Sequence, residues 1–247
     1  MAEGFNLLGF GSDAKTVKGE KEGWLTFILY LAPSTVSIPH GGRDVCPHAS
    51  KGCAASCLFT AGRGMFPQVR NARIRKTVRY FQDREAFLLD LHKDIEHAVS
   101  YAQKRGMKPC FRLNGTSDIN WSRMVATYEH LQFYDYTKNG NLVLGNDLPN
   151  YHLTFSRSEE NEAEALLLMA QGHNVAVVFP DKNFPEHWNG VPVINGDVND
   201  LRFLDPKGCV VGLRAKGQAK KDMTGFVVRS GPVAQPTKVL EPVFAAG

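Results

Sequence analysis

The chain has 247 residues, of which 43% are hydrophobic and 22% charged, a composition typical of a folded protein with one large or two small domains. Its formal net charge of +4 permits an anionic partner without requiring one. No apolar run reaches the length of a membrane span, and the first residues lack the basic start and apolar core of a signal peptide. We therefore expect a cytoplasmic protein without a membrane segment, in which thiols stay reduced.

The elements predicted along the chain alternate between strands and helices. Residues 1–22 are polar and rich in glycine and lysine, which predicts an irregular lead-in with a short strand or hairpin. Short apolar segments rich in β-branched and aromatic residues predict strands over 24–31, 108–115, 133–138, 151–157, 174–179, 191–195 and 209–215. Helical spacing of apolar residues predicts helices over 66–81, 83–106, 122–130 and 158–172, with Asp83 and Ser158 as caps.

The predicted helix over 66–81 is unusually basic. Its apolar stripe is formed by Ile74, Val78 and Phe81, at three- and four-residue spacing. The rest of its surface carries Arg70, Arg73, Arg75, Lys76 and Arg79. Such a face could contact the phosphates of a nucleic acid, although basic helix faces more often are simply solvated.

This alternation is typical of parallel β/α units. We predict an α/β fold, a partial or distorted (β/α) barrel of six to seven mainly parallel strands; an open doubly wound sheet is the alternative. The whole chain, 1–247, is expected to form one domain. Residues 23–216 would form its β/α core, and the basic, then proline-rich, tail over 217–247 would wrap around the outside.

The most informative stretch is the loop predicted directly after the first strand. Cys46, Cys53 and Cys57, three of the five cysteines, lie there with C-x6-C-x3-C spacing. Pro47 and Gly52 are expected to bend this loop, so that several sulfur atoms point at one centre. In a reducing compartment, clustered cysteines are more often metal ligands than disulfides. We therefore predict that these three thiolates bind a metal centre.

The spacing favours an iron–sulfur cluster over zinc, because zinc sites more often use C-x2-C pairs. A [4Fe–4S] cluster held by three thiolates would leave one iron open for a small chelating ligand. For zinc, a fourth ligand is needed, and His48, Cys110 or Cys209 could supply it. Cys110 and Cys209 lie in predicted strands, where a cysteine is usually a small buried apolar residue. A loop without any metal is the remaining possibility.

Polar residues follow several predicted strands. In parallel β/α folds the carboxyl ends of the strands form the site, so these residues would face one cavity with the cysteines at its rim. We expect Asn114, Asp118, Lys138, Ser156 and Arg157 to bind a small-molecule cosubstrate or substrate there. The alternative is that loop residues are polar in most proteins.

Several segments together resemble a bacteriophage protein family, whose namesake is gene product eighty-eight of a mycobacteriophage. The segments are 31–34 (Leu-Ala-Pro-Ser), 46–58 (the three cysteines with their spacer residues), 61–64 (Ala-Gly-Arg-Gly), 72–77 (the Ala-Arg-x2-Lys-Thr helix) and 112–118 (Arg-Leu-Asn-Gly-Thr-Ser-Asp). The resemblance spans residues 24 to 216, and its N-terminal half carries most of the specific positions.

The chain is more distantly similar to radical S-adenosylmethionine enzymes, in which a strand, a three-cysteine loop and a helix open a partial (β/α) barrel. That likeness implies a [4Fe–4S] cluster on Cys46, Cys53 and Cys57, with the open iron chelated by S-adenosylmethionine. The chain departs from the pattern of those enzymes at two places. Their spacing is C-x3-C-x2-C, and residues 114–118 (Asn-Gly-Thr-Ser-Asp) stand where they have Gly-Gly-Glu.

Two functions follow from these expectations. The first is a phage-encoded iron–sulfur protein, an enzyme of the radical S-adenosylmethionine type or a divergent relative. The second is a phage-encoded binding protein in which zinc or a closed cluster only staples the loop. Such a protein would act on nucleic acid or on a host protein.

Overall fold

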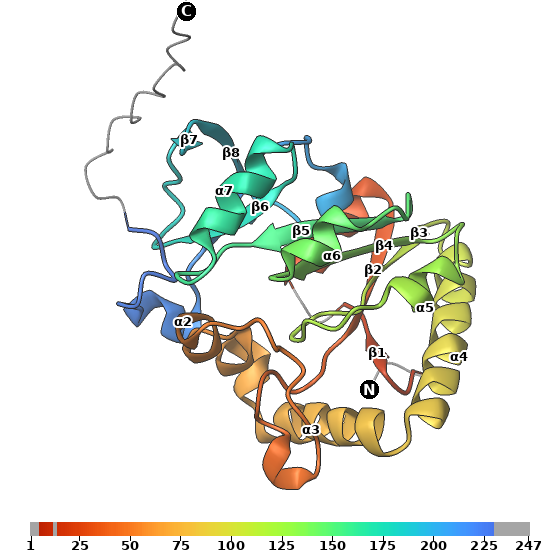
Figure 1. The fold of residues 1–247 in the computed structure, drawn as a ribbon. Helices are drawn as coiled ribbons and strands as arrows, with labels where there is room; N and C mark the ends of the chain where they lie inside the picture. Colours follow the sequence, from red (N-terminus) through yellow and green to blue (C-terminus); the bar gives the residue numbers. More distant parts are fainter. Residues whose placement is uncertain (1–4, 12–13, 230–247) are drawn as a thin grey trace, which may run out of the picture.

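The computed structural model of the protein describes residues 5–11 and 14–229 (Figure 1). Within these residues one sheet of nine strands has the order β1-β2-β3-β4-β5-β6-β9-β8-β7. The strands are β1 (Leu8–Gly9), β2 (Trp24–Leu29), β3 (Lys108–Arg112), β4 (Gln132–Thr137), β5 (Tyr151–Ser156), β6 (Val175–Phe179), β7 (His187–Trp188), β8 (Val191–Asn195) and β9 (Val210–Arg214). All seven strands predicted from the sequence are present. The short strand predicted in the lead-in is β1, whereas β7 was not predicted.

The sheet is mainly parallel, as predicted, but it does not close into a barrel. Strands β2 to β6 lie side by side in chain order, and β9 and β8 continue the parallel pairing beyond β6. Two-residue antiparallel strands, β1 and β7, pair at the two edges. The first and last parallel strands of the sheet, β2 and β8, therefore do not pair with each other, and the sheet stays open. The unreversed order of β2 to β6 resembles a barrel, whereas the free edges are those of an open sheet.

Seven α-helices lie within the described residues (Figure 1). They are α1 (Ala14–Gly19), α2 (Lys51–Ala55), α3 (Pro67–Gln82), α4 (Arg84–Gln103), α5 (Ser122–Ala126), α6 (Gly140–Leu144) and α7 (Glu162–Ala170). The four predicted helices correspond to α3, α4, α5 and α7, and Asp83 caps α4 by accepting a hydrogen bond from the backbone nitrogen of Ala86. Ser158 is not the N-cap of α7, because α7 begins at Glu162 and its N-cap is Asn161. None of the described helices is long and apolar enough to cross a membrane.

One face of the sheet packs against the helices. Alternate residues of a strand point to the same face, and a row of aromatic side chains runs across that face through Phe27, Phe111 and Phe133. The centroids of Phe27 and Phe111 are 5.7 Å apart, and those of Phe111 and Phe133 are 5.1 Å apart. Leu91 and Ile95 of α4 belong to the same fully buried cluster. This core fixes where each strand ends, and the strand ends position the site.

Helix α3 presents a different face to the protein from the predicted one. Its buried residues are Arg73, Thr77 and Tyr80, one position before each residue of the predicted stripe. Thr77 Oγ1 accepts a hydrogen bond of 2.8 Å from the backbone nitrogen of Ala32, which docks the segment after β2 onto the helix. The predicted stripe (Ile74, Val78 and Phe81) is half-buried at the margin of this contact. The buried face of α3 is therefore shifted by one residue from the predicted face, because Arg73 and the hydrogen-bonded Thr77 occupy the inner side of the helix.

Candidate functional site

A cavity of about 1150 Å³ lies at the carboxyl ends of the strands. Residues that end or follow β3, β4, β5 and β9 form one side of it. The cysteine loop, α3 and the segment 5–11 complete the lining. The cavity stands where parallel β/α folds generally place their sites.

All three clustered cysteines line this cavity. Cys46 lies in the loop after β2, Cys53 lies within α2, and Cys57 follows that helix directly. Ser50 is the N-cap of α2, and its Oγ accepts a hydrogen bond of 3.1 Å from the backbone nitrogen of Cys53. Cys57 is four residues from Cys53 but lies outside α2 with a non-helical backbone (φ −57°, ψ 139°), so helical periodicity does not set the direction of its thiol.

The sequence suggested that Gly52 bends the loop, but this glycine lies buried inside α2. A Cβ atom at this position would come within 2.2 Å of Thr224 Oγ1 and 2.6 Å of Glu159 Oε1. Glu159 holds the start of α2, because its carboxylate accepts hydrogen bonds from the backbone nitrogen of Gly52 (2.7 Å) and from Ser50 Oγ (2.8 Å). The glycine is therefore needed for close approach. Nothing in the local sequence around Glu159 reveals this contact, which joins segments more than 100 residues apart.

The three thiols are near enough to influence one another's charge. Burial, together with the charges of Cys57, Asp118 and Cys53, raises the pKa of Cys46 to about 12. Burial also raises the pKa of Cys57, as does the charge of Cys53. Arg73 and Lys138 act in the opposite direction on Cys57. Three soft sulfur donors with two cations beside them fit a thiophilic metal centre by their chemistry.

The arrangement of these side chains differs from that of a single-ion site. Among the described residues, no group of three His, Cys, Asp or Glu side chains is placed so that it could hold a metal ion. The candidate fourth ligands lie elsewhere: His48 is exposed and outside the cavity lining, and Cys110 and Cys209 are buried outside it. The Cys209 thiol donates to the backbone oxygen of Pro206, at 3.2 Å.

The loop after β3 contributes two predicted site residues, Asn114 and Asp118, and both line the cavity. The Asn114 side chain is occupied by its own loop: its Oδ1 accepts from Ser117 Oγ at 2.8 Å, and its amide donates to the Ile119 oxygen at 2.8 Å. The backbone nitrogen of Asp118 donates to the oxygen of Val45 at 2.7 Å, which ties this loop to the residue before Cys46. Asn114 thus shapes the loop, while Asp118 connects it to the cysteines.

Asp118, Lys138 and Ser156 form a connected polar group on the cavity wall. The carboxylate of Asp118 accepts from Thr137 Oγ1 at 2.7 Å and from the backbone nitrogen of Lys138 at 2.9 Å. Lys138 Nζ donates to Ser156 Oγ at 2.9 Å. Three of the five predicted ligand-binding residues therefore meet at the ends of β3, β4 and β5.

Arg157 lies apart from this group. It is buried and is not among the residues that line the cavity. Its guanidinium donates to the carboxylate of Glu162 and to the backbone oxygen of Gly225. These contacts fasten the segment after β9 to the start of α7.

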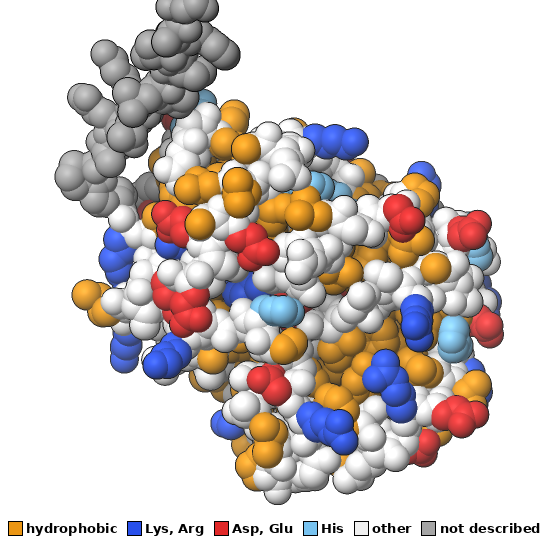
Figure 2. Space-filling model, in the orientation of Figure 1, with side chains coloured by type: hydrophobic (Ala, Val, Ile, Leu, Met, Phe, Trp, Pro, Cys, Tyr) orange, Lys and Arg blue, Asp and Glu red, His pale blue; other side chains and the backbone are white. Residues whose placement is uncertain are grey.

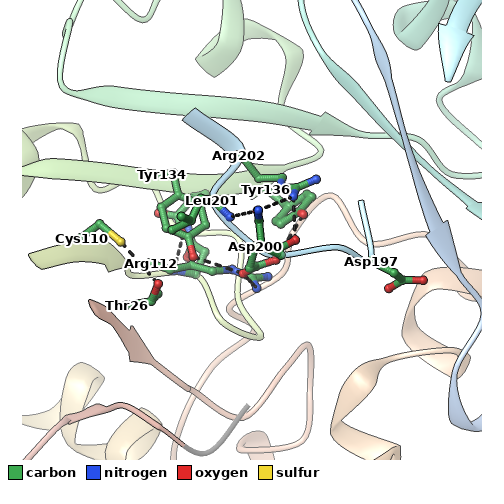
Figure 3. A network of polar contacts seen from close by, with 12 residues as sticks. Thr26, Cys110, Arg112, Tyr134, Tyr136, Asp197, Asp200, Leu201 and Arg202 are labelled. Atoms are coloured by element: carbon green, nitrogen blue, oxygen red, sulfur yellow. Dashed lines mark hydrogen bonds and ion pairs between the residues drawn. The ribbon is translucent and has the colours of Figure 1, made fainter. Parts of the chain in front are cut away.

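A buried network that the sequence did not reveal lies on the sheet face opposite the one that packs against α4 (Figure 3). Arg112 Nη1 donates to Asp200 Oδ2 at 2.9 Å, and Tyr134 Oη donates to the same oxygen at 3.2 Å. Burial disfavours the charge of Arg112, but Asp200 outweighs it, so the pKa of Arg112 is raised. Both Arg112 and Asp200 line the cavity. The signal available in the sequence was only the charge of residue 112 inside a predicted strand.

The basic residues of α3 are largely engaged within the protein. Arg79 pairs with Asp90 at 2.7 Å, Lys76 Nζ donates to the oxygen of Leu7 at 2.9 Å, and Arg73 is buried. Arg70 and Arg75 are the exposed ones on this helix. On the face seen in Figure 2, basic and acidic side chains are interspersed. The continuous basic stripe expected for nucleic-acid contact is therefore reduced to two residues on α3.

The fold and the site define an α/β protein whose mainly parallel sheet carries a three-cysteine cavity at its strand ends. Residues 6–230 match the family described as Gene product 88, and the chain belongs to this family. No curated protein and no solved structure matches the chain. The family resemblance inferred from the sequence motifs is confirmed, whereas these comparisons give no match to radical S-adenosylmethionine enzymes.

Proposed function

We propose that the protein binds a [4Fe–4S] cluster through Cys46, Cys53 and Cys57 and acts as a phage enzyme similar to the radical S-adenosylmethionine type. The observation that carries the proposal is that three thiols from one short segment line the same cavity and influence one another's ionisation. The other two cysteines, Cys110 and Cys209, lie outside this lining.

The sequence spacing of the three cysteines favours a cluster over a single zinc ion. Zinc requires its ligands to converge on one point at about 2.3 Å from sulfur. In a cluster each thiolate binds a different iron atom, so the sulfur atoms stand farther apart. The C-x6-C-x3-C spacing favours the second arrangement, because zinc sites more often use C-x2-C pairs.

The residues around the thiols have roles in this proposal. Arg73 and Lys138 favour the thiolate form of Cys57 and would offset the negative charge of the loaded site. Asp118, Lys138 and Ser156 would bind and orient the polar groups of the cosubstrate, because they project into the same cavity. When bound, a reduced cluster with an open iron supplies the electron that cleaves the sulfonium of S-adenosylmethionine.

The experiment is purification without oxygen, followed by an absorption spectrum and assays of iron, sulfide and zinc. We expect broad absorbance in the blue with iron and sulfide. The Cys53→Ala variant should lose this absorbance, and the Cys209→Ala variant should keep it, because Cys209 lies outside the cavity lining. Zinc in a colourless wild-type protein would instead support a metal-stapled binding protein. Equal spectra for the two variants would contradict the ligand assignment.

The enzymatic part of the proposal needs a separate measurement. The reduced protein is incubated with S-adenosylmethionine, and 5′-deoxyadenosine is measured. We expect its formation by the wild-type protein and not by the Cys53→Ala variant. An intact cluster without 5′-deoxyadenosine would leave an iron–sulfur protein of another activity.

A further inference from the structure

The lining of the cavity is strongly cationic. Eight of its side chains are Lys or Arg and two are Asp. Of the two acids, Asp200 is paired with Arg112, and Asp118 accepts from the backbone nitrogen of Lys138. The whole chain carries a formal charge of only +4, so the positive charge is concentrated here. A water-filled hollow with this imbalance attracts an anion, because low-dielectric walls focus the field.

One cation of the lining is buried without a carboxylate. Arg73 is 9% exposed, and its guanidinium lies over the ring of Tyr30 with 4.4 Å to the centroid. Its guanidinium also lies over the ring of Phe59, with 5.7 Å to the centroid. Among the described residues Arg73 forms no salt bridge, and its Nε and Nη1 have no hydrogen-bond acceptor.

This state of Arg73 is costly. A buried donor without an acceptor loses its hydrogen bonds to water without replacement, and the penalty is larger when the group is charged. The two aromatic rings hold the guanidinium plane in place, so the cation is preorganised. Such a group is stabilised by an oxyanion that enters the cavity, and two or three oxygen atoms of a phosphate match the donors of a guanidinium.

Neighbouring residues of α3 extend the positive surface. Lys76 also lines the cavity, and burial together with the charge of Arg73 lowers the pKa of its amine to about 8. Arg75 is exposed and belongs to the lining as well. Three cations within about one turn of one helix suit a ligand with more than one negative charge.

We propose that the cavity binds an anionic small molecule, a phosphate- or polyphosphate-bearing one, and that Arg73 holds its oxyanion on the α3 wall. The claim that this anion is the substrate of the enzyme rests on the proposed function. The anion site itself does not require the cluster, because Arg73 is held by Tyr30, Phe59 and the helix.

Calorimetric titration of the full-length protein tests the proposal, with pyrophosphate as the probe. We expect saturable binding by the wild-type protein, and a loss of at least about tenfold in affinity for Arg73→Gln, since one charge-assisted contact contributes about 1.5–3 kcal/mol. Arg123→Gln is the matched control, because Arg123 is exposed on α5 and lies outside the lining. That variant should bind like the wild type.

Two further arms keep the test decisive. Arg73→Lys retains the charge on a flexible stem, and we expect it to fold and to bind more weakly than the wild type. Malonate replaces pyrophosphate in the second arm, where tighter binding would assign a carboxylate in place of a phosphate. Absence of binding by the wild type, or equal binding by Arg73→Gln, would overturn the proposal. If Arg73→Gln loses iron but still binds pyrophosphate, Arg73 serves the cluster and the anion site is refuted, while the proposed function stands.

Discussion

Glu159 Oε1 accepts a hydrogen bond of 2.7 Å from the backbone nitrogen of Gly52, although 107 positions separate the two residues in the chain. The second carboxylate oxygen accepts from Ser50 Oγ at 2.8 Å. Both contacts act on the first turn of α2, which carries Cys53. The loop after β5 therefore holds the cysteine segment in place, and the position of the thiols depends on a distant carboxylate.

The first prediction concerns this carboxylate. Glu159→Gln removes the charge that two donors share, and we expect a loss of about 1–3 kcal/mol in the free energy of unfolding. Under the proposed function the variant should also retain less iron after anaerobic purification. Urea denaturation and an iron assay measure the two effects. The exposed neighbour Glu160, changed to Gln, is the control, and equal behaviour of the two variants would show that the contact is dispensable.

The second prediction concerns Gly115, in the loop after β3. A Cβ atom there would lie 2.6 Å from Tyr30 Cδ1 and 2.8 Å from the backbone oxygen of Leu29. We expect Gly115→Ala to destabilise the fold by about 1–3 kcal/mol, because the backbone must shift to relieve the overlap. In Gly9→Ala the added atom would lie 4.0 Å from its nearest neighbour, so thermal denaturation should show little change. Similar melting temperatures for both variants would contradict this packing.

The third prediction concerns the buried pair Arg112–Asp200, whose side chains are 14% and 5% exposed. Asp200→Asn leaves the guanidinium charge without its carboxylate, and breaking a buried pair on one side costs about 3–5 kcal/mol. Urea denaturation of Asp200→Asn and of the exposed Asp147→Asn gives the comparison. A difference below about 1 kcal/mol would mean that water or another group compensates Arg112.

The fourth prediction concerns acid stability. Burial lowers the pKa of His152 to about 4, and the charges of Arg202 and Lys207 act in the same direction. The unfolded chain therefore binds a proton at this residue at a higher pH than the folded protein does, so stability is lost as the pH falls. Relative to His152→Phe, the wild type should lose about 3 kcal/mol between about pH 7 and pH 4.

Chemical denaturation of both proteins across this range measures the difference directly. The buried carboxyl groups Asp135 and Asp205, whose pKa values are raised to about 7 and about 6, titrate in both proteins and cancel in the comparison. A constant difference at all pH values would show that the pKa of His152 is the same in the folded protein as in the unfolded chain.

The sequence predicted those features that follow from local patterns. The seven predicted strands and helix α4 were recognisable because side chains repeat every two residues in a strand and every three or four in a helix. The cysteine spacing and the polar strand ends also indicated a shared cavity. In this structure Cys46, Cys53, Cys57, Asp118 and Lys138 line one such cavity.

The tertiary structure decided what local patterns cannot encode. It left the sheet open, rotated α3 so that Arg73 faces inward, and used Asn114 and Arg157 for internal contacts. It also placed Glu159 against the start of α2, the helix that carries Cys53. Each of these outcomes depends on the packing of segments far apart in the chain. Periodicity reports on the neighbours of a residue along its own element, whereas contacts across the fold exist only once the sheet and its helices have assembled.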